Sequence, residues 1–168
     1  LGSGGRIARE APMQIVPSLW IEGSAEEAAR FYARALPDSR VDRVTVVPGD
    51  SPSGPEGAVV VAEMTLLGQP FTVMQARGGE AFSQAVSFTI LCDTQAEVDR
   101  LWDALQEGGG RPVACGWLRD RHGLSWQVCP RRMYELMADP DRDRARRATA
   151  AMMGMVKLDI AGLERAAA

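Results

Sequence analysis

The chain has 168 residues, of which 46% are hydrophobic and 24% charged, and its formal charge is −3. This composition is typical of a globular protein with one compact core, and the acidic balance excludes nucleic-acid binding driven by excess positive charge. No apolar run could cross a bilayer and no signal peptide is visible, so we expect a cytoplasmic protein without a membrane partner.

The first 12 residues are small and polar, and Met13 follows them directly. We interpret residues 1–12 as a tag or a disordered leader and leave them out of the fold. Cys92, Cys115 and Cys129 form no CxxC pair and are odd in number. They fit neither a disulfide framework nor a zinc knuckle, so we expect buried free thiols.

An internal repeat organises the chain. Residues 16–32, VPSLWIEGSAEEAARFY, align with residues 86–102, VSFTILCDTQAEVDRLW, after a shift of 70. Each copy is predicted to form a short strand and then a helix, with Ser24 or Thr94 as N-cap and a glutamate three residues later. The first helix should end before Pro37 and the second at the glycines of 108–110.

Strand-rich sequence follows each helix, and a shift of 55 places Gly68 on Gly123, where each glycine suits the left-handed position of a hairpin turn. The pattern predicts an α+β fold of two βαβββ modules, about 13–77 and 84–130, in one domain over residues 13–130. A helical extension follows over 131–168, with PDRDRARRATAAMMGM and DIAGLERA as its helices. Its methionines are interpreted as packing residues.

Paired βαβββ modules resemble the vicinal oxygen chelate superfamily, which includes glyoxalase I, extradiol dioxygenases and fosfomycin resistance proteins. Five runs resemble its PhnB-like branch, often named 3-demethylubiquinone-9 3-methyltransferase: AEEAARFYARALPDSRV, LLGQPFTVM, VSFTILCDTQAEVDRLWDAL, CGWLRDRHGLSWQVCP and AMMGMVKLDIAGLERA. The resemblance covers residues 14–166 and implies curved mixed sheets around a cavity. It also implies a homodimer, because such two-module chains often pair about a twofold axis.

The methyltransferase name finds no support in the residues. A nucleotide-type methyl donor usually lies over a Gly-rich turn between a strand and a helix in a doubly wound sheet. This chain has neither that turn nor the alternation of strands and helices that a doubly wound sheet requires.

The resemblance also locates the metal positions of the superfamily, where metal-using members carry His and Glu on matching strands. Those positions hold Pro17, Thr72, Ser87 and Gln127 here. None supplies an imidazole or a carboxylate, so we expect no metal and no cofactor. His122, the only histidine, precedes Gly123 and is interpreted as a solvated turn residue.

Strand alternation assigns side chains to two faces. The residues of one face, which include Trp20, Phe71 and Trp126, are bulky and suit packing under the helices. The other mixes apolar side chains with hydroxyls and an amide, which is typical of a small-molecule pocket, although a filled structural interior is the alternative. The candidate pocket residues are Leu19, Thr72, Met74, Ser87, Thr89, Trp117 and Gln127.

Glu63 lies in the interior of a predicted strand and is the candidate general base, with a solvated edge residue as the alternative. Three functions remain open. The first is metal-independent binding of an unidentified small molecule. The second is a superfamily enzyme of lyase, isomerase or dioxygenase type, acting through Glu63 or an atypical metal. The third is a structural dimerisation module with a closed interior.

Overall fold

The computed structural model describes residues 13–168, so the interpretation of the first 12 residues lies outside the described part. The first module runs β1 (Ser18–Ile21), α1 (Ala25–Ala35), β2 (Arg40–Val46), β3 (Val60–Leu66) and β4 (Gln69–Gln75). The second runs β5 (Phe88–Cys92), α2 (Gln95–Gln106), β6 (Arg111–Pro112), β7 (Trp117–Arg119) and β8 (Ser125–Pro130).

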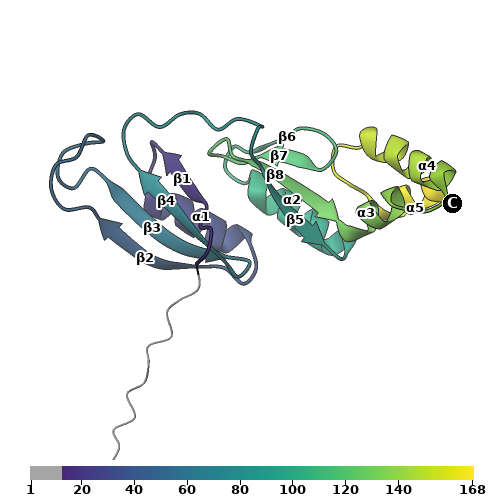
Figure 1. Ribbon diagram of the computed structural model, residues 1–168, viewed down its shortest axis with the longest axis horizontal. Helices are drawn as coiled ribbons and strands as arrows, with labels where there is room; N and C mark the ends of the chain where they lie inside the picture. Colours follow the sequence, from purple (N-terminus) through teal and green to yellow (C-terminus); the bar gives the residue numbers. More distant parts are fainter. Residues whose placement is uncertain (1–12) are drawn as a thin grey trace, which may run out of the picture.

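The two sheets have the same topology, with strand orders β1-β4-β3-β2 and β5-β8-β7-β6. The first two strands of each order are parallel and the other neighbours are antiparallel. Figure 1 shows the sheets side by side along the long axis of the molecule. The predicted α+β fold of two βαβββ modules is therefore confirmed.

Local sequence signals account for the ends of the helices and for the hairpin turns. The Ser24 side chain accepts a hydrogen bond from the Glu27 backbone nitrogen at 3.2 Å, and Thr94 forms a complete capping box with Glu97. Gly68 and Gly123 have φ angles of 77° and 83°, a region that favours glycine because a Cβ would be strained there. These features position β4 and β8 beside their parallel partners.

One hydrophobic cluster contains residues of both modules, so the modules share a core. Helix α1 contributes Phe31 and Tyr32 to this cluster, and the rings of Phe71 and Phe88 meet across the module boundary with centroids 5.1 Å apart. The buried side chains of β4 and β8 include Val73 and Val128, which are related by the shift of 55. The repeat therefore governs packing as well as topology.

The C-terminal tail packs against the end of the second module (Figure 1). It contains α3 (Arg131–Met137), α4 (Arg142–Met153) and α5 (Ile160–Ala167), so the two expected helices are present and α3 is an addition. A second hydrophobic cluster joins the tail to β8, through residues that include Cys129, Met133, Leu158 and Leu163. Burial of these side chains attaches the tail to the second sheet.

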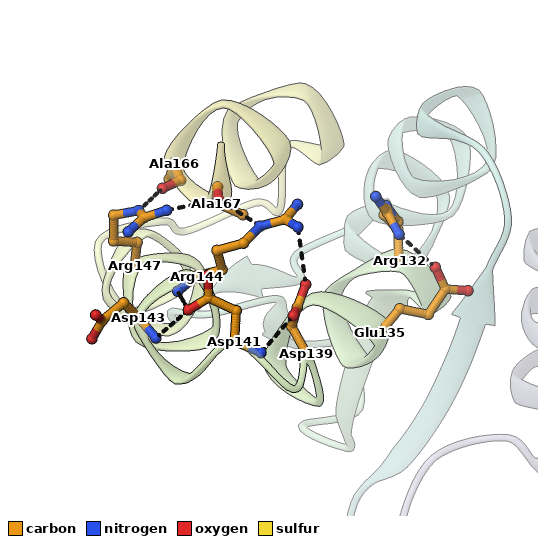
Figure 2. A network of polar contacts seen from close by, with 9 residues as sticks. All are labelled: Arg132, Glu135, Asp139, Asp141, Asp143, Arg144, Arg147, Ala166 and Ala167. Carbon is orange, nitrogen blue, oxygen red and sulfur yellow. Dashed lines mark hydrogen bonds and ion pairs between the residues drawn. The ribbon is translucent and has the colours of Figure 1, made fainter.

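Arginines of α4 hold the last helix in place. Arg144 and Arg147 donate to the backbone oxygens of Ala166 and Ala167 at 3.0–3.1 Å (Figure 2). These carbonyls lie in the last turn of α5, where a helix leaves acceptors without partners. Among residues 13–168, no helix combines the length and apolar character that a membrane span requires.

Candidate functional site

The open face of the second sheet gathers four of the predicted pocket residues. Ile90, Trp126 and Val128 are buried, as expected for the face beneath α2. On the opposite face, Thr89 and Trp117 both pair with Gln127, one from each side. The Gln127 Nε2 donates to the Ser87 Oγ at 2.9 Å. Ser87, Thr89, Trp117 and Gln127 therefore form one polar and aromatic patch.

The first sheet departs from the predicted facing. Leu19 is 5% exposed and lies in the core, whereas Trp20, expected beneath the helices, is 38% exposed. In the β1–β4 ladder Ser18 pairs with Thr72, and their hydroxyl oxygens are 2.6 Å apart. The placement of Leu19 in a pocket is therefore wrong, and Ser18 lies on the open face instead.

A loop that is one residue longer explains the reversal. Two residues, Glu22 and Gly23, separate the buried Ile21 from the Ser24 N-cap, whereas only Asp93 separates the buried Cys92 from the Thr94 N-cap. A shift of 70 therefore aligns the helices but misaligns the strands by one residue. Because side chains alternate along a strand, a slip of one residue exchanges the two faces.

Thr72 and Met74 lie on the open face of the first sheet with Glu63, which pairs with Thr72 in the β3–β4 ladder. The Glu63 carboxylate accepts from the Arg43 guanidinium on β2, and its side chain is 40% exposed. This ion pair engages the carboxylate, and an engaged carboxylate is less available as a general base. The geometry agrees with the alternative interpretation of Glu63 as a solvated surface residue.

A groove of about 660 Å³ lies between the open face of the second sheet and the tail. Its floor includes Trp117, Gln127 and Cys129. Helices α3 and α4 form the facing wall, with Met133, Tyr134, Met137, Met152 and Met153. We call this feature the methionine groove. Burial raises the pKa of the Cys129 thiol, so this floor residue is a weak nucleophile near neutral pH.

The wall of this groove was not predicted from the sequence. Helix α3 was not predicted, although Met133, Leu136 and Met137 have the spacing of one helical face. The methionines of α4 were interpreted as packing residues. Met152 does pack beside the tail cluster, but Met153 is 65% exposed. Only the docking of the tail shows that these side chains face the sheet across a groove.

His122 is not the solvated turn residue that was expected. It is half-buried, its ring centroid lies 5.8 Å from those of Phe31 and Tyr32, and burial lowers its pKa. Its Nε2 is buried and has no hydrogen-bond partner within residues 13–168. The turn packs onto α1 of the first module, which shields part of the imidazole from solvent. His122 also lines a separate cavity of about 300 Å³ with Trp20 and Glu22.

The residues at the expected metal positions do not fit a divalent metal. Ser87 and Gln127 bond to each other and offer only hydroxyl and amide groups, whereas zinc prefers imidazole, thiolate and carboxylate ligands. Within residues 13–168, no three His, Cys, Asp or Glu side chains are grouped so that they could hold an ion.

Two βαβββ modules in one chain are the fold of the vicinal oxygen chelate superfamily. A glyoxalase family protein from Bacillus cereus shares this fold at 12% identity, with a TM-score of 0.52 over 74% of this chain and 97% of that one. The family model described as 3-demethylubiquinone-9 3-methyltransferase matches residues 13–129. The chain therefore belongs to this family, the PhnB-like branch of the superfamily.

Two solved structures support this assignment. The PhnB protein of Bacillus cereus, to which the same methyltransferase name is attached, is 30% identical, with a TM-score of 0.60 over 70% of this chain and 99% of that chain. A protein from Pseudomonas aeruginosa is 26% identical, with a TM-score of 0.52 over 71% of this chain and 98% of that chain. The comparison with curated proteins finds no match.

Proposed function

We propose that this protein binds a small molecule in the methionine groove, without the divalent metal that other members of its superfamily use. The observation that carries the proposal is an open groove of about 660 Å³ whose floor contains Gln127, bonded to Ser87. Small-molecule sites commonly measure about 300–1,000 Å³, so the groove could take a ligand of ordinary size.

The composition of the lining supports the same proposal. Apolar side chains predominate, and the amides of Gln84 and Gln127 are among the few polar groups. Binding sites for small molecules have this makeup, because apolar walls supply affinity and a few polar groups orient the ligand. A neighbouring hollow shares Tyr134 with the groove and is lined by Thr89, Leu91, Arg131, Tyr134 and Glu135.

The family name does not supply a reaction for this chain. The two strand-to-helix connections are Glu22-Gly23-Ser24 and Asp93-Thr94, and neither is the Gly-rich turn that cradles a nucleotide-type methyl donor. Binding without an assigned reaction is the function that the groove supports best.

A thermal-shift screen with a chemically diverse compound set tests the proposal. We expect compounds that raise the Tm of the wild-type protein to lose this effect in Gln127→Ala. The matched control is Thr72→Ala, which alters the corresponding residue of the first sheet, outside the groove lining. Chelation with EDTA should leave the shifts unchanged. Hits that are insensitive to Gln127→Ala would refute the site, and a stoichiometric metal found by elemental analysis would refute metal independence.

A further inference from the structure

The two sides of the methionine groove differ in their relation to the family. The floor residues Trp117, Gln127 and Cys129 lie within residues 13–129, which the family model matches. The wall belongs to α3 and α4, which begin after that match ends. The Bacillus cereus PhnB structure is covered over 99% of its length by only 70% of this chain. The wall therefore lies outside the residues that the family model matches.

The wall is rich in methionine, and its members range from Met133, which is 6% exposed, to Met153, which is 65% exposed. Four of its side chains are methionines, from two different helices, and among residues 13–168 no charged side chain lines the groove. Thioethers are flexible and polarisable, so they adapt to ligands of different shape and make favourable contacts with aromatic rings. Trp117 on the floor offers an aromatic surface opposite them.

The absence of charge from this lining restricts the ligand. An ionised group brought into an apolar groove loses its hydration, and the lining offers no opposite charge to compensate for that loss. An uncharged ligand avoids this cost. It can still hydrogen-bond to the amides of Gln84 and Gln127.

We propose that helices α3 and α4 make this groove selective for an uncharged aromatic molecule, which stacks between Trp117 and the methionine wall. This inference rests on the proposed function, because it names the ligand class of the same site. The sheet floor binds the ligand, and the tail determines which class of ligand is accepted.

The test uses N-phenyl-1-naphthylamine, an uncharged aromatic dye whose fluorescence rises in apolar surroundings, titrated into the full-length protein. We expect saturable binding to the wild-type protein, and binding at least about tenfold weaker in Met153→Glu, because a charge enters the groove. Met153 is 65% exposed, so the substitution should not prevent folding. Met153→Leu keeps the wall apolar and should stay within about threefold of the wild-type affinity.

Met13→Glu is the matched control, since it introduces the same charge at a fully exposed methionine outside the groove. It should bind the dye as the wild-type protein does. Trp117→Ala alters the floor and should also weaken binding. The sulfonated dye 1-anilinonaphthalene-8-sulfonate, similar in ring size but anionic, should bind more weakly than the neutral dye.

The outcomes separate this inference from the proposed function. If Trp117→Ala weakens binding and Met153→Glu does not, the floor is a binding site and the role of the wall is refuted. If none of the groove substitutions affects binding, or no binding occurs, both proposals fail. Equal affinity for the anionic dye would refute the ligand class. Light scattering shows whether the dye also dissociates a dimer. If it does, and if Met153→Glu weakens this dissociation as it weakens dye binding, the occupant of the groove is a second copy of the chain. That result would also overturn the inference.

Discussion

Asp120 is the residue that links the turn of the β7–β8 hairpin to the first module. It is 3% exposed and accepts hydrogen bonds from the Tyr32 hydroxyl and the Trp126 Nε1, both at 2.8 Å, and from two backbone nitrogens of the turn. Burial, with the nearby Asp120 carboxylate, raises the pKa of Tyr32. A carboxylate with this many donors is satisfied in a buried position, so the turn is held rigidly against α1.

His122, in the same turn, should make stability depend on pH. Burial lowers its pKa from the ordinary 6.5, with Asp120 opposing and Arg121 adding to the effect. The folded state therefore binds fewer protons than the unfolded state below pH 6.5. His122 should contribute its full stability above that pH and progressively less as the pH falls towards its lowered pKa.

Urea unfolding of the wild-type protein and His122→Gln at several pH values between 5 and 7.5 checks this expectation. The wild-type protein should lose more unfolding free energy on acidification than the variant. The reason is that only the wild type has an imidazole that binds a proton more readily in the unfolded state than in the folded state. Comparison with the variant removes the contribution of the carboxylates to the pH dependence of the unfolding free energy. Parallel curves for the two proteins would show that His122 titrates equally in both states.

At the scale of elements, the contacts between α4 and α5 indicate how the tail keeps its shape. Arg147 donates through its Nε and one terminal nitrogen to the last-turn carbonyls of α5. Arg146 on the same helix forms an ion pair with Asp143 instead, and 78% of its side chain is exposed. Cations stabilise a helix C-terminus through its exposed carbonyls and dipole. Arg147 should therefore support α5 and Arg146 should not.

Hydrogen exchange measured by mass spectrometry distinguishes the two arginines. We expect Arg147→Ala to speed amide exchange in residues 160–167 and to lower the free energy of unfolding by about 1 kcal/mol, because charge-assisted hydrogen bonds are lost. Arg146→Ala should change stability by less than about 0.5 kcal/mol, as is typical of an exposed pair. Equal exchange in the two variants would contradict the role assigned to Arg147.

At the scale of the whole molecule, exposed apolar residues point to self-association. Among residues 13–168, strand β2 pairs only with β3, and Val44 and Val46 on this edge strand are 37% and 56% exposed. Free edges and exposed apolar side chains are common features of surfaces that bind another chain. We therefore propose that the homodimer implied by the family resemblance forms through the first sheet.

Size-exclusion chromatography with light scattering tests this arrangement. We expect a mass near twice that of the 18.2 kDa chain, and a shift towards the monomer in Val46→Lys, which places a charge on the exposed edge. Met153→Glu alters the opposite end of the molecule and should leave the mass unchanged. A monomeric wild-type protein at micromolar concentration would rule out the dimer.

The sequence alone was sufficient for the features that depend on local interactions. The capping pairs at Ser24 and Thr94, the turn glycines at 68 and 123 and the paired βαβββ modules were all predictable, because each depends on residues close together in the chain or on the repeat. The common face of Thr89 and Gln127 followed from the alternation of side chains along a strand.

Tertiary structure alone decided the features that depend on distant contacts. The faces of β1 were reversed by one extra loop residue, since strand facing has a period of two and tolerates no error of register. The burial of His122 required the turn of one module to pack on the helix of the other. The methionine groove arises where α3 and α4 pack over the second sheet, and no local pattern in the sequence specifies which surface a helix will cover.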